Sequence, residues 1–343
     1  MKLIKTEDAA GHVLCHDITQ IIKGVTKDAV FRKGHVVTEE DIPVLLSVGK
    51  ENLYVWEKEE GMLHENEAAE ILREISQGDH MHPSEVKEGK IELIADCDGV
   101  LKIDREKLRR VNSLGEMMIA CRHGDFPVKK GDKIAGTRVI PLVIAEEKMQ
   151  RAKEVCSGGP IFRIIPYRHR KVGIVTTGSE VYHHRIEDTF TPVIKEKLAE
   201  FDTEIRGHIV CSDDHEMITE AIRDLLKTGC DMIVCTGGMS VDPDDRTPLA
   251  IRNAGTKVVS YGAPVLPGAM FLLAYYGGDL PVMGLPGCVM YARRTIFDLV
   301  LPRIMAGEVL TQEDLNGLGE GGLCLGCPAC TFPNCGFGKN GGN

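Results

Sequence analysis

The chain has 343 residues, of which 43% are hydrophobic and 27% charged, and its formal net charge at pH 7 is −10. At about 150 residues per domain, this length predicts roughly two domains with additional segments. The negative charge argues against nucleic-acid binding, and no apolar run approaches the ~20 residues of a membrane span, so we expect neither a nucleic-acid partner nor insertion into a membrane.

The first segment, residues 1–60, is predicted to be a small α+β unit. Residues 1–8 turn polar at once and lack the apolar stretch of a secretory signal, so we expect a cytoplasmic protein with reduced cysteines. Residues 29–37 show a strand–turn–strand pattern, and residues 38–49 predict a helix with Thr38 at its N-cap and Gly49 just past its end. A strand is expected at 52–56 and a linker at 57–61.

Residues 61–165 begin with a helix and continue as short strands separated by turns. Strands are expected at 90–95, 100–103, 117–121 and 137–144, and a connecting helix at 145–156. Short strands at regular turn spacing favour a small β-rich barrel or sandwich. We identify no catalytic constellation in this segment.

From residue 166 to 310 the pattern changes to strands that alternate with helices. Strands are expected at 172–175, 205–210, 232–235, 257–260 and 281–284, and helices at 190–201 and after Asp213, which is a candidate cap with Glu216. This alternation predicts an α/β fold, a mostly parallel sheet sandwiched by helices, following the smaller β-rich N-terminal domains.

Four polar or glycine-bearing loops follow the predicted strands of this region, at 177–180, 212–214, 236–240 and 284–287. Ligands of open α/β sheets bind where the carboxyl ends of the strands and the helix N-termini converge. Gly237 and Gly238 would let the backbone approach an anion closely, and Thr236 and Ser240 add hydroxyl groups. The alternative is that the paired glycines only form a tight turn between a strand and a helix.

Three acids follow these glycines, Asp242, Asp244 and Asp245. Carboxylates beside an anion site are expected where a divalent ion bridges them to phosphate or to an oxyanion. The alternative is an acidic cap before Thr247 and Pro248, which needs no ligand.

The order and spacing of the loops, together with Asp245-Arg246-Thr247 and Leu266-Pro267-Gly268, resemble the molybdopterin-binding domain. The molybdopterin molybdenumtransferases (gephyrin E-domain-like proteins) and the molybdopterin adenylyltransferases share that domain, and the resemblance covers residues 171–308. It implies that molybdopterin contacts Gly178, Glu180, Gly237, Gly238, Ser240, Pro286 and Gly287. The same loops add Thr177, Ser179, Thr236 and Cys288 as candidates. The resemblance also implies that Asp214 and Asp245 act in catalysis by handling Mg²⁺ or molybdate.

This chain departs from the transferases at several of these positions. Ser179 stands where they usually carry aspartate, Cys288 stands in place of asparagine, and Leu266 and Ala269 replace two lysines. Because a lysine supplies a point charge for an oxyanion, this loss weakens the case for molybdate capture. Cys288 is either a crevice thiol that contacts sulfur or metal chemistry, or a small buried apolar residue.

The expected function is molybdopterin binding in molybdenum cofactor biosynthesis, including insertion of molybdate into molybdopterin or its adenylylated form. The alternative is a non-catalytic carrier or insertion chaperone for a client molybdoenzyme, and a third interpretation is an unrelated nucleotide-binding enzyme on the same fold. The resemblance also implies a homo-oligomer.

The last segment, residues 311–343, is a tail rich in glycine and cysteine. Cys324, Cys327, Cys330 and Cys335 form a C-x2-C-x2-C-x4-C run, close to the spacing of bacterial iron–sulfur sites. Four thiolates would also bind zinc, and the spacing does not choose between the two. The alternative is a terminus whose cysteines bind nothing.

Overall fold

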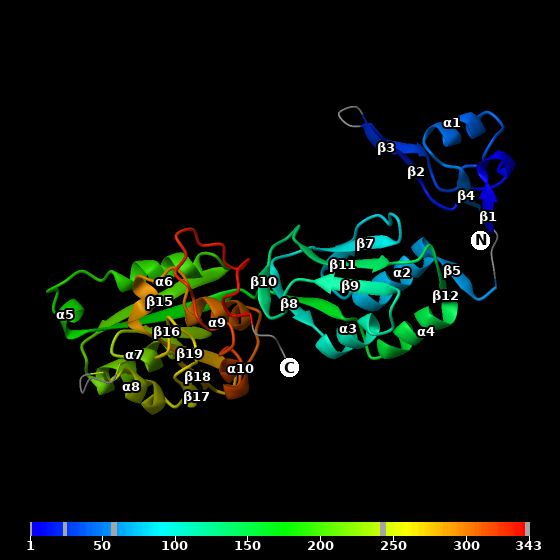
Figure 1. Cartoon of the computed structure of the whole chain (residues 1–343). Helices are drawn as coiled ribbons and strands as arrows, with labels where there is room; N and C mark the ends of the chain where they lie inside the picture. Colours follow the sequence, from blue (N-terminus) through cyan, green and yellow to red (C-terminus); the bar gives the residue numbers. More distant parts are fainter. Residues whose placement is uncertain (1, 23–25, 56–59, 241–244, 340–343) are drawn as a thin grey trace.

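The structure is a computed structural model that describes residues 2–22, 26–55, 60–240 and 245–339. An N-terminal part (residues 2–55), a middle part (60–166) and an α/β part (167–310) follow one another along an elongated molecule (Figure 1). The tail (311–339) returns to the α/β part. Trp56, most of the predicted linker, Asp242 and Asp244 lie outside the described residues.

The N-terminal part contains two antiparallel strand pairs and one α-helix around a small core. Strand β1 (Lys2–Lys5) pairs with β4 (Asn52–Val55), and β2 (Ile18–Ile22) pairs with β3 (Thr26–Phe31). A short helix η1 (Thr6–Asp8) precedes β2. Helix α1 (Asp41–Ser47) begins later than predicted, because the Thr38 backbone N–H donates to the Asp41 carboxylate at 2.8 Å outside the helix.

The middle part contains strands in separate small sheets and three helices. Its elements are β5 (Met62–His64), α2 (Glu65–Ser76), β6 (Met81–Pro83), β7 (Lys90–Ala95), β8 (Gly99–Ile103), α3 (Arg105–Asn112), β9 (Met117–Cys121), β10 (Phe126–Val128), β11 (Lys133–Val139), β12 (Val143–Ala145), α4 (Glu146–Val155) and β13 (Phe162–Pro166). The sheets have the orders β6-β7-β11-β9, β10-β8-β13 and β12-β5.

The middle part differs from an all-β barrel or sandwich because its helices share its core. Ala68 and Leu72 of α2, Val111 of α3, and Met149 of α4 are buried with the strand residues. Helix α3 was not predicted, although Asp104 caps it by accepting from the Lys107 backbone N–H. The strand expected at 137–144 is divided into β11 and β12 around Pro141, which has no N–H for a sheet hydrogen bond.

The α/β part contains a six-stranded sheet of order β15-β14-β16-β19-β18-β17. Its elements are β14 (Arg170–Thr177), α5 (Ser179–Tyr182), α6 (Phe190–Leu198), β15 (Thr203–Cys211), α7 (His215–Lys227), β16 (Met232–Thr236), α8 (Thr247–Asn253), β17 (Lys257–Tyr261), β18 (Leu272–Tyr276), β19 (Leu280–Leu285), η2 (Gly287–Met290) and α9 (Ile296–Met305). Strands β15, β14, β16 and β19 are parallel, whereas β18 and β17 are antiparallel to their neighbours. The predicted fold class is confirmed.

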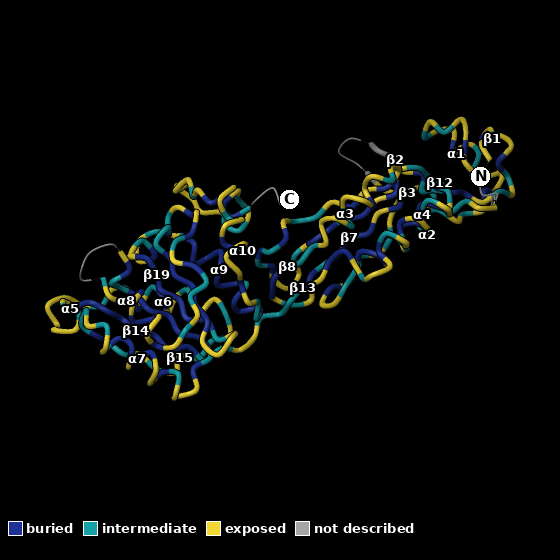
Figure 2. Tube along the Cα trace, turned by 90° about the horizontal axis from the view of Figure 1, so that it is seen from below, coloured by how far each residue is buried: buried dark blue, intermediate teal, exposed yellow. Residues whose placement is uncertain are grey.

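Helices cover both faces of this sheet. Val172 and Ile174 of β14 lie in one core with α6 and α9, whereas Val175 lies in a second core with α7 and α8. Figure 2 shows buried residues along these strands and exposed residues on the outer turns. A strand that is apolar on both faces requires cover on both, which explains the short apolar runs of the sequence.

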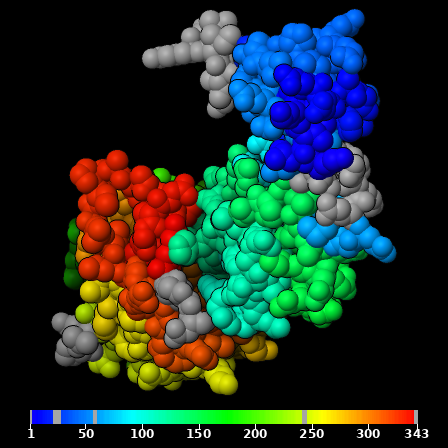
Figure 3. All heavy atoms as spheres, turned by 45° about the vertical axis from the view of Figure 1, so that its right-hand side comes forward, coloured from blue at the N-terminus to red at the C-terminus, as the bar shows by residue number. Residues whose placement is uncertain are grey.

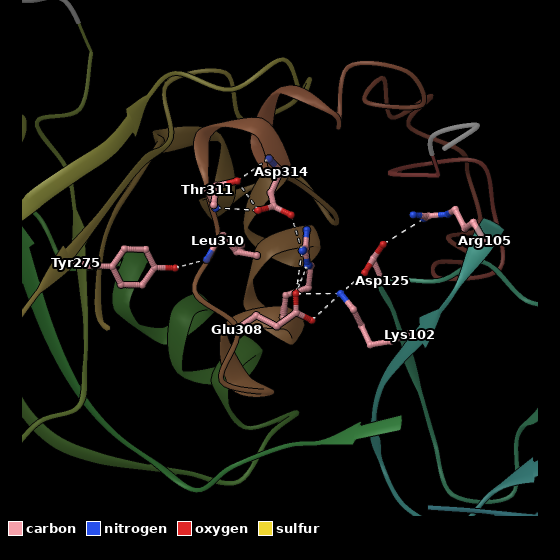
Figure 4. A network of polar contacts seen from close by, with 9 residues as sticks. Lys102, Arg105, Asp125, Tyr275, Glu308, Leu310, Thr311 and Asp314 are labelled. Carbon is pink, nitrogen blue, oxygen red and sulfur yellow. Dashed lines mark hydrogen bonds and ion pairs between the residues drawn. The ribbon is translucent and has the colours of Figure 1, made fainter. Parts of the chain in front are cut away.

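Polar contacts join the middle part to the α/β part (Figure 4). Arg303 of α9 binds Glu308 at 2.8 Å and Asp314 of α10 (Gln312–Asn316) at 2.7 Å. Lys102 of β8 binds the same Glu308 at 3.1 Å and also pairs with Asp125. No helix among the described residues combines the length and the apolar character needed to cross a bilayer.

Candidate functional site

The four predicted loops follow the carboxyl ends of the four parallel strands. Strands β14, β15, β16 and β19 end at Thr177, Cys211, Thr236 and Leu285. From β14 the chain passes through α6 to β15 on one side, and then through α7 to β16 on the other side of β14. The gap between β14 and β16 is therefore the point where the chain direction reverses, and crevices at such points bind ligands in this class of sheet.

Three threonines hold the loop after β16. The Thr177 hydroxyl donates to the Thr236 carbonyl at 3.1 Å and lies 3.2 Å from the Thr247 hydroxyl. The Thr247 hydroxyl in turn donates to the Gly237 carbonyl at 2.9 Å. These buried bonds fix the path of residues 236–238 between β14 and the start of α8.

The two glycines of this loop are required by the packing of the protein itself. Gly237 has φ 86°, and a Cβ there would lie 2.2 Å from the Thr177 carbonyl oxygen. Gly238 has φ 54°, and its Cβ would lie 2.8 Å from the Thr247 hydroxyl. The tight-turn interpretation thus accounts for both glycines, and contact of their backbone amides with an anion stays a prediction.

Asp213 joins the loop after β14 to the loop after β15. Its carboxylate accepts from the Ser179 backbone N–H at 2.8 Å, and its own N–H lies 3.4 Å from the Ser179 hydroxyl. The Glu180 carboxylate folds back toward Gly178, where an added Cβ would lie 3.2 Å from Oε1. The expected cap of α7 at Asp213 is wrong, because Asp213 bonds across the loops and its neighbour caps the helix.

Asp214 is the N-cap of α7. One carboxylate oxygen accepts from the backbone N–H groups of Glu216 at 2.8 Å and Met217 at 2.9 Å. These two bonds lower the pKa of Asp214, so it carries a negative charge at neutral pH. The cap explains an acid here without a ligand, and a role with Mg²⁺ or molybdate stays a prediction.

Asp245 lies on the β17 side of the loop after β16. The pKa of the Tyr261 hydroxyl is raised, mainly because the group is partly buried and secondly because Asp245 is negatively charged. That hydroxyl donates to the Met239 carbonyl at 2.8 Å and lies 3.2 Å from the Ser240 carbonyl.

Across residues 2–22, 26–55, 60–240 and 245–339, no three His, Cys, Asp or Glu side chains are grouped closely enough to hold a metal ion.

Thr236 carries a buried hydroxyl at the carboxyl end of β16. The residue is 0% exposed, and among the described residues its Oγ1 has no hydrogen-bond partner. Buried polar atoms are normally paired, so a ligand oxygen is a suitable partner for this group. Contact of this hydroxyl with a phosphorylated ligand stays a prediction.

The loop after β19 places Pro286, Gly287 and Cys288 at the same edge. Pro286 is buried and precedes η2, Gly287 is exposed, and Cys288 is half-buried. Burial raises the pKa of the Cys288 thiol. Cys288 is thus neither a fully buried apolar residue nor an exposed thiolate.

Two family models match the chain. One, described as "Probable molybdopterin binding domain", matches residues 173–306, the region that carries the sheet and its loops. Residues 173–306 form a domain of the molybdopterin-binding family. The other is described as a domain of unknown function and matches residues 3–57 of the N-terminal part.

Curated relatives and solved structures each match a part of the chain. A CinA-like protein of Mycobacterium avium (strain 104) is 36% identical over 90 residues, which are 26% of this chain and 21% of the relative, so the chain spans about a fifth of the curated relatives that it matches. The molybdopterin biosynthesis enzyme MoaB of Thermus thermophilus is 25% identical, with a TM-score of 0.34, over 39% of this chain and 91% of that chain. CinA of Thermoplasma acidophilum, a protein described as of unknown function, is 20% identical, with a TM-score of 0.31, over 35% of this chain and 89% of its own.

The sequence analysis missed a second polar group beside the molybdopterin-binding loops. The Thr176 hydroxyl lies 2.7 Å from the Thr191 hydroxyl and 2.9 Å from His208 Nε2, and Asp188 lies 3.8 Å from the same nitrogen. His208 and Asp188 also line a cavity of about 580 Å³ beside α5. The available sequence signal was the Thr176–Thr177 pair, because successive residues of a strand point to opposite faces of the sheet and the two hydroxyls therefore place polar groups on both faces.

The segment around Leu266 and Pro267 contacts the tail. Leu266, at 56% exposure, accepts from the Cys324 backbone N–H at 2.8 Å and donates to the Gly322 carbonyl at 2.8 Å. The Leu266–Pro267 peptide bond is cis. The cysteine tail therefore docks on the molybdopterin-binding domain at Leu266.

Proposed function

We propose that the molybdopterin-binding domain binds molybdopterin or its adenylylated form at the carboxyl edge of β14 and β16. One observation carries the proposal: the family match over residues 173–306 coincides with the convergence of four polar loops at the point where the chain direction reverses. The protein takes part in molybdenum cofactor assembly or in delivery of the cofactor to a molybdoenzyme, as a cytoplasmic homo-oligomer.

The loops at this edge provide hydrogen bonds for the phosphorylated end of the ligand. Backbone N–H groups of Gly237 and Gly238 supply donors without side-chain bulk, and the Thr236 hydroxyl supplies a further one, whereas the Gly178 N–H already donates to the Cys211 carbonyl at 3.2 Å. The bond that the Ser179 N–H donates to Asp213 and the bond that the Thr247 hydroxyl donates to the Gly237 carbonyl hold two of these loops before the ligand arrives. A site that is held in advance loses less entropy on binding.

The reaction proposed for this domain is insertion of molybdate into the pterin dithiolene. Asp214 and Asp245 would hold Mg²⁺ and the molybdate substrate, since both carboxylates follow strands at the ligand edge. A non-catalytic carrier is the second candidate. It is favoured by Leu266 and Ala269, because neither side chain supplies the positive charge that captures an oxyanion.

Purified protein mixed with adenylylated molybdopterin, Mg²⁺ and molybdate should yield molybdenum-loaded cofactor. Asp245→Asn and Asp214→Asn should each slow this reaction by about 10²-fold or more, as expected when one charged group is removed from a transition state. Asparagine is chosen at Asp214 because it is also a good N-cap, so α7 stays capped.

Pterin affinity is measured in parallel, and Asp224→Asn on the exposed side of α7 serves as the control. Loss of insertion with unchanged pterin affinity supports the catalytic assignment. Tight pterin binding by the wild-type protein with no loaded product supports the carrier and rejects the enzyme.

A further inference from the structure

The tail is held against the molybdopterin-binding domain at both ends of its cysteine run. Before the run, Leu323 pairs with Leu266 in a parallel bridge. After it, Phe337 is 5% exposed and belongs to the core that contains α9. Figure 1 and Figure 3 show the tail, in red, between α9 and the middle part. The run is therefore a loop fixed at two points.

Two of the four cysteines lie at an exposed bend of this loop. Cys327 and Cys330 are exposed free thiols, and the chain bends at the two residues between them. Cys324 and Cys335 differ from this pair, because they are half-buried and pack against the core. The C-x2-C spacing of the exposed pair is that of thiols that form a reversible disulfide.

The exposed pair lines a cavity of about 600 Å³ that also contains two arginines. Among the described residues that line this cavity, Arg293 and Arg294 are basic and no residue carries a carboxylate side chain. Arg293 donates to the Pro328 carbonyl at 2.7 Å, between the two cysteines, and the Arg294 side chain forms a hydrogen bond with Cys330. A positive charge next to a thiol favours the thiolate, which is the form that attacks disulfides.

The acids behind the cavity do not neutralise this positive charge. The Arg294 guanidinium lies 2.8 Å from the Asp298 carboxylate, which Lys197 also binds at 2.7 Å. Glu200 lies farther from Arg294, at 3.6 Å. When Arg293 is included, three cations are present with two carboxylates, so a net positive charge remains beside the thiols.

We infer that Cys327 and Cys330 form a redox-active dithiol that reduces small anionic disulfides. The Cys330 thiolate attacks one sulfur of the incoming disulfide, which forms a mixed disulfide and releases the first thiolate. The Cys327 thiolate then attacks the Cys330 sulfur, which closes the Cys327–Cys330 disulfide and releases the second thiolate. Two electrons pass from the dithiol to the substrate, and the two protons lost by the cysteines end on the two released thiols. This inference does not depend on pterin binding.

The cavity determines the class of disulfide that reacts. Its volume is that of a small-molecule site, and its two arginines favour a negatively charged molecule. Tyr291 and Leu325, which are 77% and 80% exposed, add apolar surface beside the thiols. The exposed position of the pair suits exchange, because exposed disulfides are the labile ones.

The test uses the full chain, fully reduced and then equilibrated with glutathione disulfide. Mass spectrometry after acid quenching and alkylation should show the loss of two thiols per chain and a Cys327–Cys330 disulfide in the peptide map. Cys327→Ser should stop at a mixed disulfide with glutathione on Cys330, whereas Cys97→Ser in the middle part should react as the wild type does. A pair that stays reduced in glutathione disulfide alone would overturn the inference, and so would a disulfide that joins either cysteine to Cys324 or Cys335.

The role of the arginines is tested by the rate of the same reaction. Arg294→Gln should slow the reaction at neutral pH by about threefold to tenfold, because the Cys330 thiolate loses its neighbouring charge, and Arg294→Lys should restore most of the rate. Arg293 is exposed, so Arg293→Gln should fold, and it should lower the rate with glutathione disulfide more than the rate with cystamine, a cationic disulfide. Equal rates in wild type and Arg294→Gln, with both proteins shown to be folded by thermal unfolding, would overturn the assignment of Cys330 as the attacking thiol. An equal effect of Arg293→Gln on the two disulfides would overturn the preference for anions.

Discussion

Alanine at Gly237 should destabilise the protein far more than alanine at Gly229. Both glycines have nearly the same left-handed backbone, with φ 86° and 84°, so both alanines carry the same conformational cost of about 1–2 kcal/mol. They differ in their surroundings, because a Cβ at Gly237 meets the Thr177 carbonyl oxygen at 2.2 Å whereas nothing lies within 4 Å of one at Gly229. The overlap should add about 1–3 kcal/mol, as overpacking does in well-filled sites.

Urea unfolding of the two variants measures this difference. The free energy of unfolding should fall more for Gly237→Ala, and pterin affinity should fall with it because the loop after β16 is displaced. Gly229→Ala lies just beyond α7 and should leave affinity unchanged. Equal losses of stability in the two variants would show that the Thr177 contact does not constrain the loop.

Replacing Arg303 by methionine should cost about 3–5 kcal/mol, the usual result of breaking a buried ion pair from one side. The Arg303 side chain is 13% exposed and bridges Glu308 and Asp314, and Lys102 of the middle part binds the same Glu308. Without the guanidinium, these acids lose their main compensating charge. The exposed pair of Arg109 and Glu106 supplies the control, and Arg109→Met should change stability far less, because solvent screens an exposed ion pair.

The Arg303 effect should also depend on pH. Asp314 is partly buried, which raises its pKa, but hydrogen bonds from Thr311 and the contacts with Arg303 outweigh burial and lower it from 3.8 to about 2. A carboxylate whose pKa is lower in the folded protein than in the unfolded chain stabilises the fold at pH values above its unfolded pKa. That contribution is lost as the pH falls toward the folded pKa. The stability difference between wild type and Arg303→Met should therefore shrink as the pH falls from 3.8 toward 2. A difference that is constant over this range would contradict the assignment of Arg303 to Asp314.

The sequence predicts the parallel core of the sheet well because that signal is local. Each short apolar run lies between a turn and an amphipathic helix, and helix α7 carries its buried residues at the expected spacing. Strand β18 was missed, since the apolar run at 271–276 has no alternation to distinguish it, and its antiparallel pairing depends on distant partners. Helix α3 was missed because it buries only Val111.

The sequence predicts where the site lies, but it does not predict the contacts within the site. Convergence of the loops follows from the order of the strands in the sheet. A glycine is required at position 237 because a Cβ there would overlap Thr177, which lies far away in the sequence. Likewise, Asp213 and Asp214 look equivalent as helix caps until Ser179 takes the first as its partner. In the tail, cysteine spacing predicts a ligand set, whereas among the described residues no three His, Cys, Asp or Glu side chains are grouped closely enough to hold a metal ion.

Anaerobic calorimetric titration of the full chain with molybdopterin tests the central claim most directly. The account predicts saturable heat with one site per chain, retained in Gly229→Ala and weakened in Gly237→Ala. Heat no greater than that of dilution, from protein shown to be folded by its unfolding transition, would contradict it.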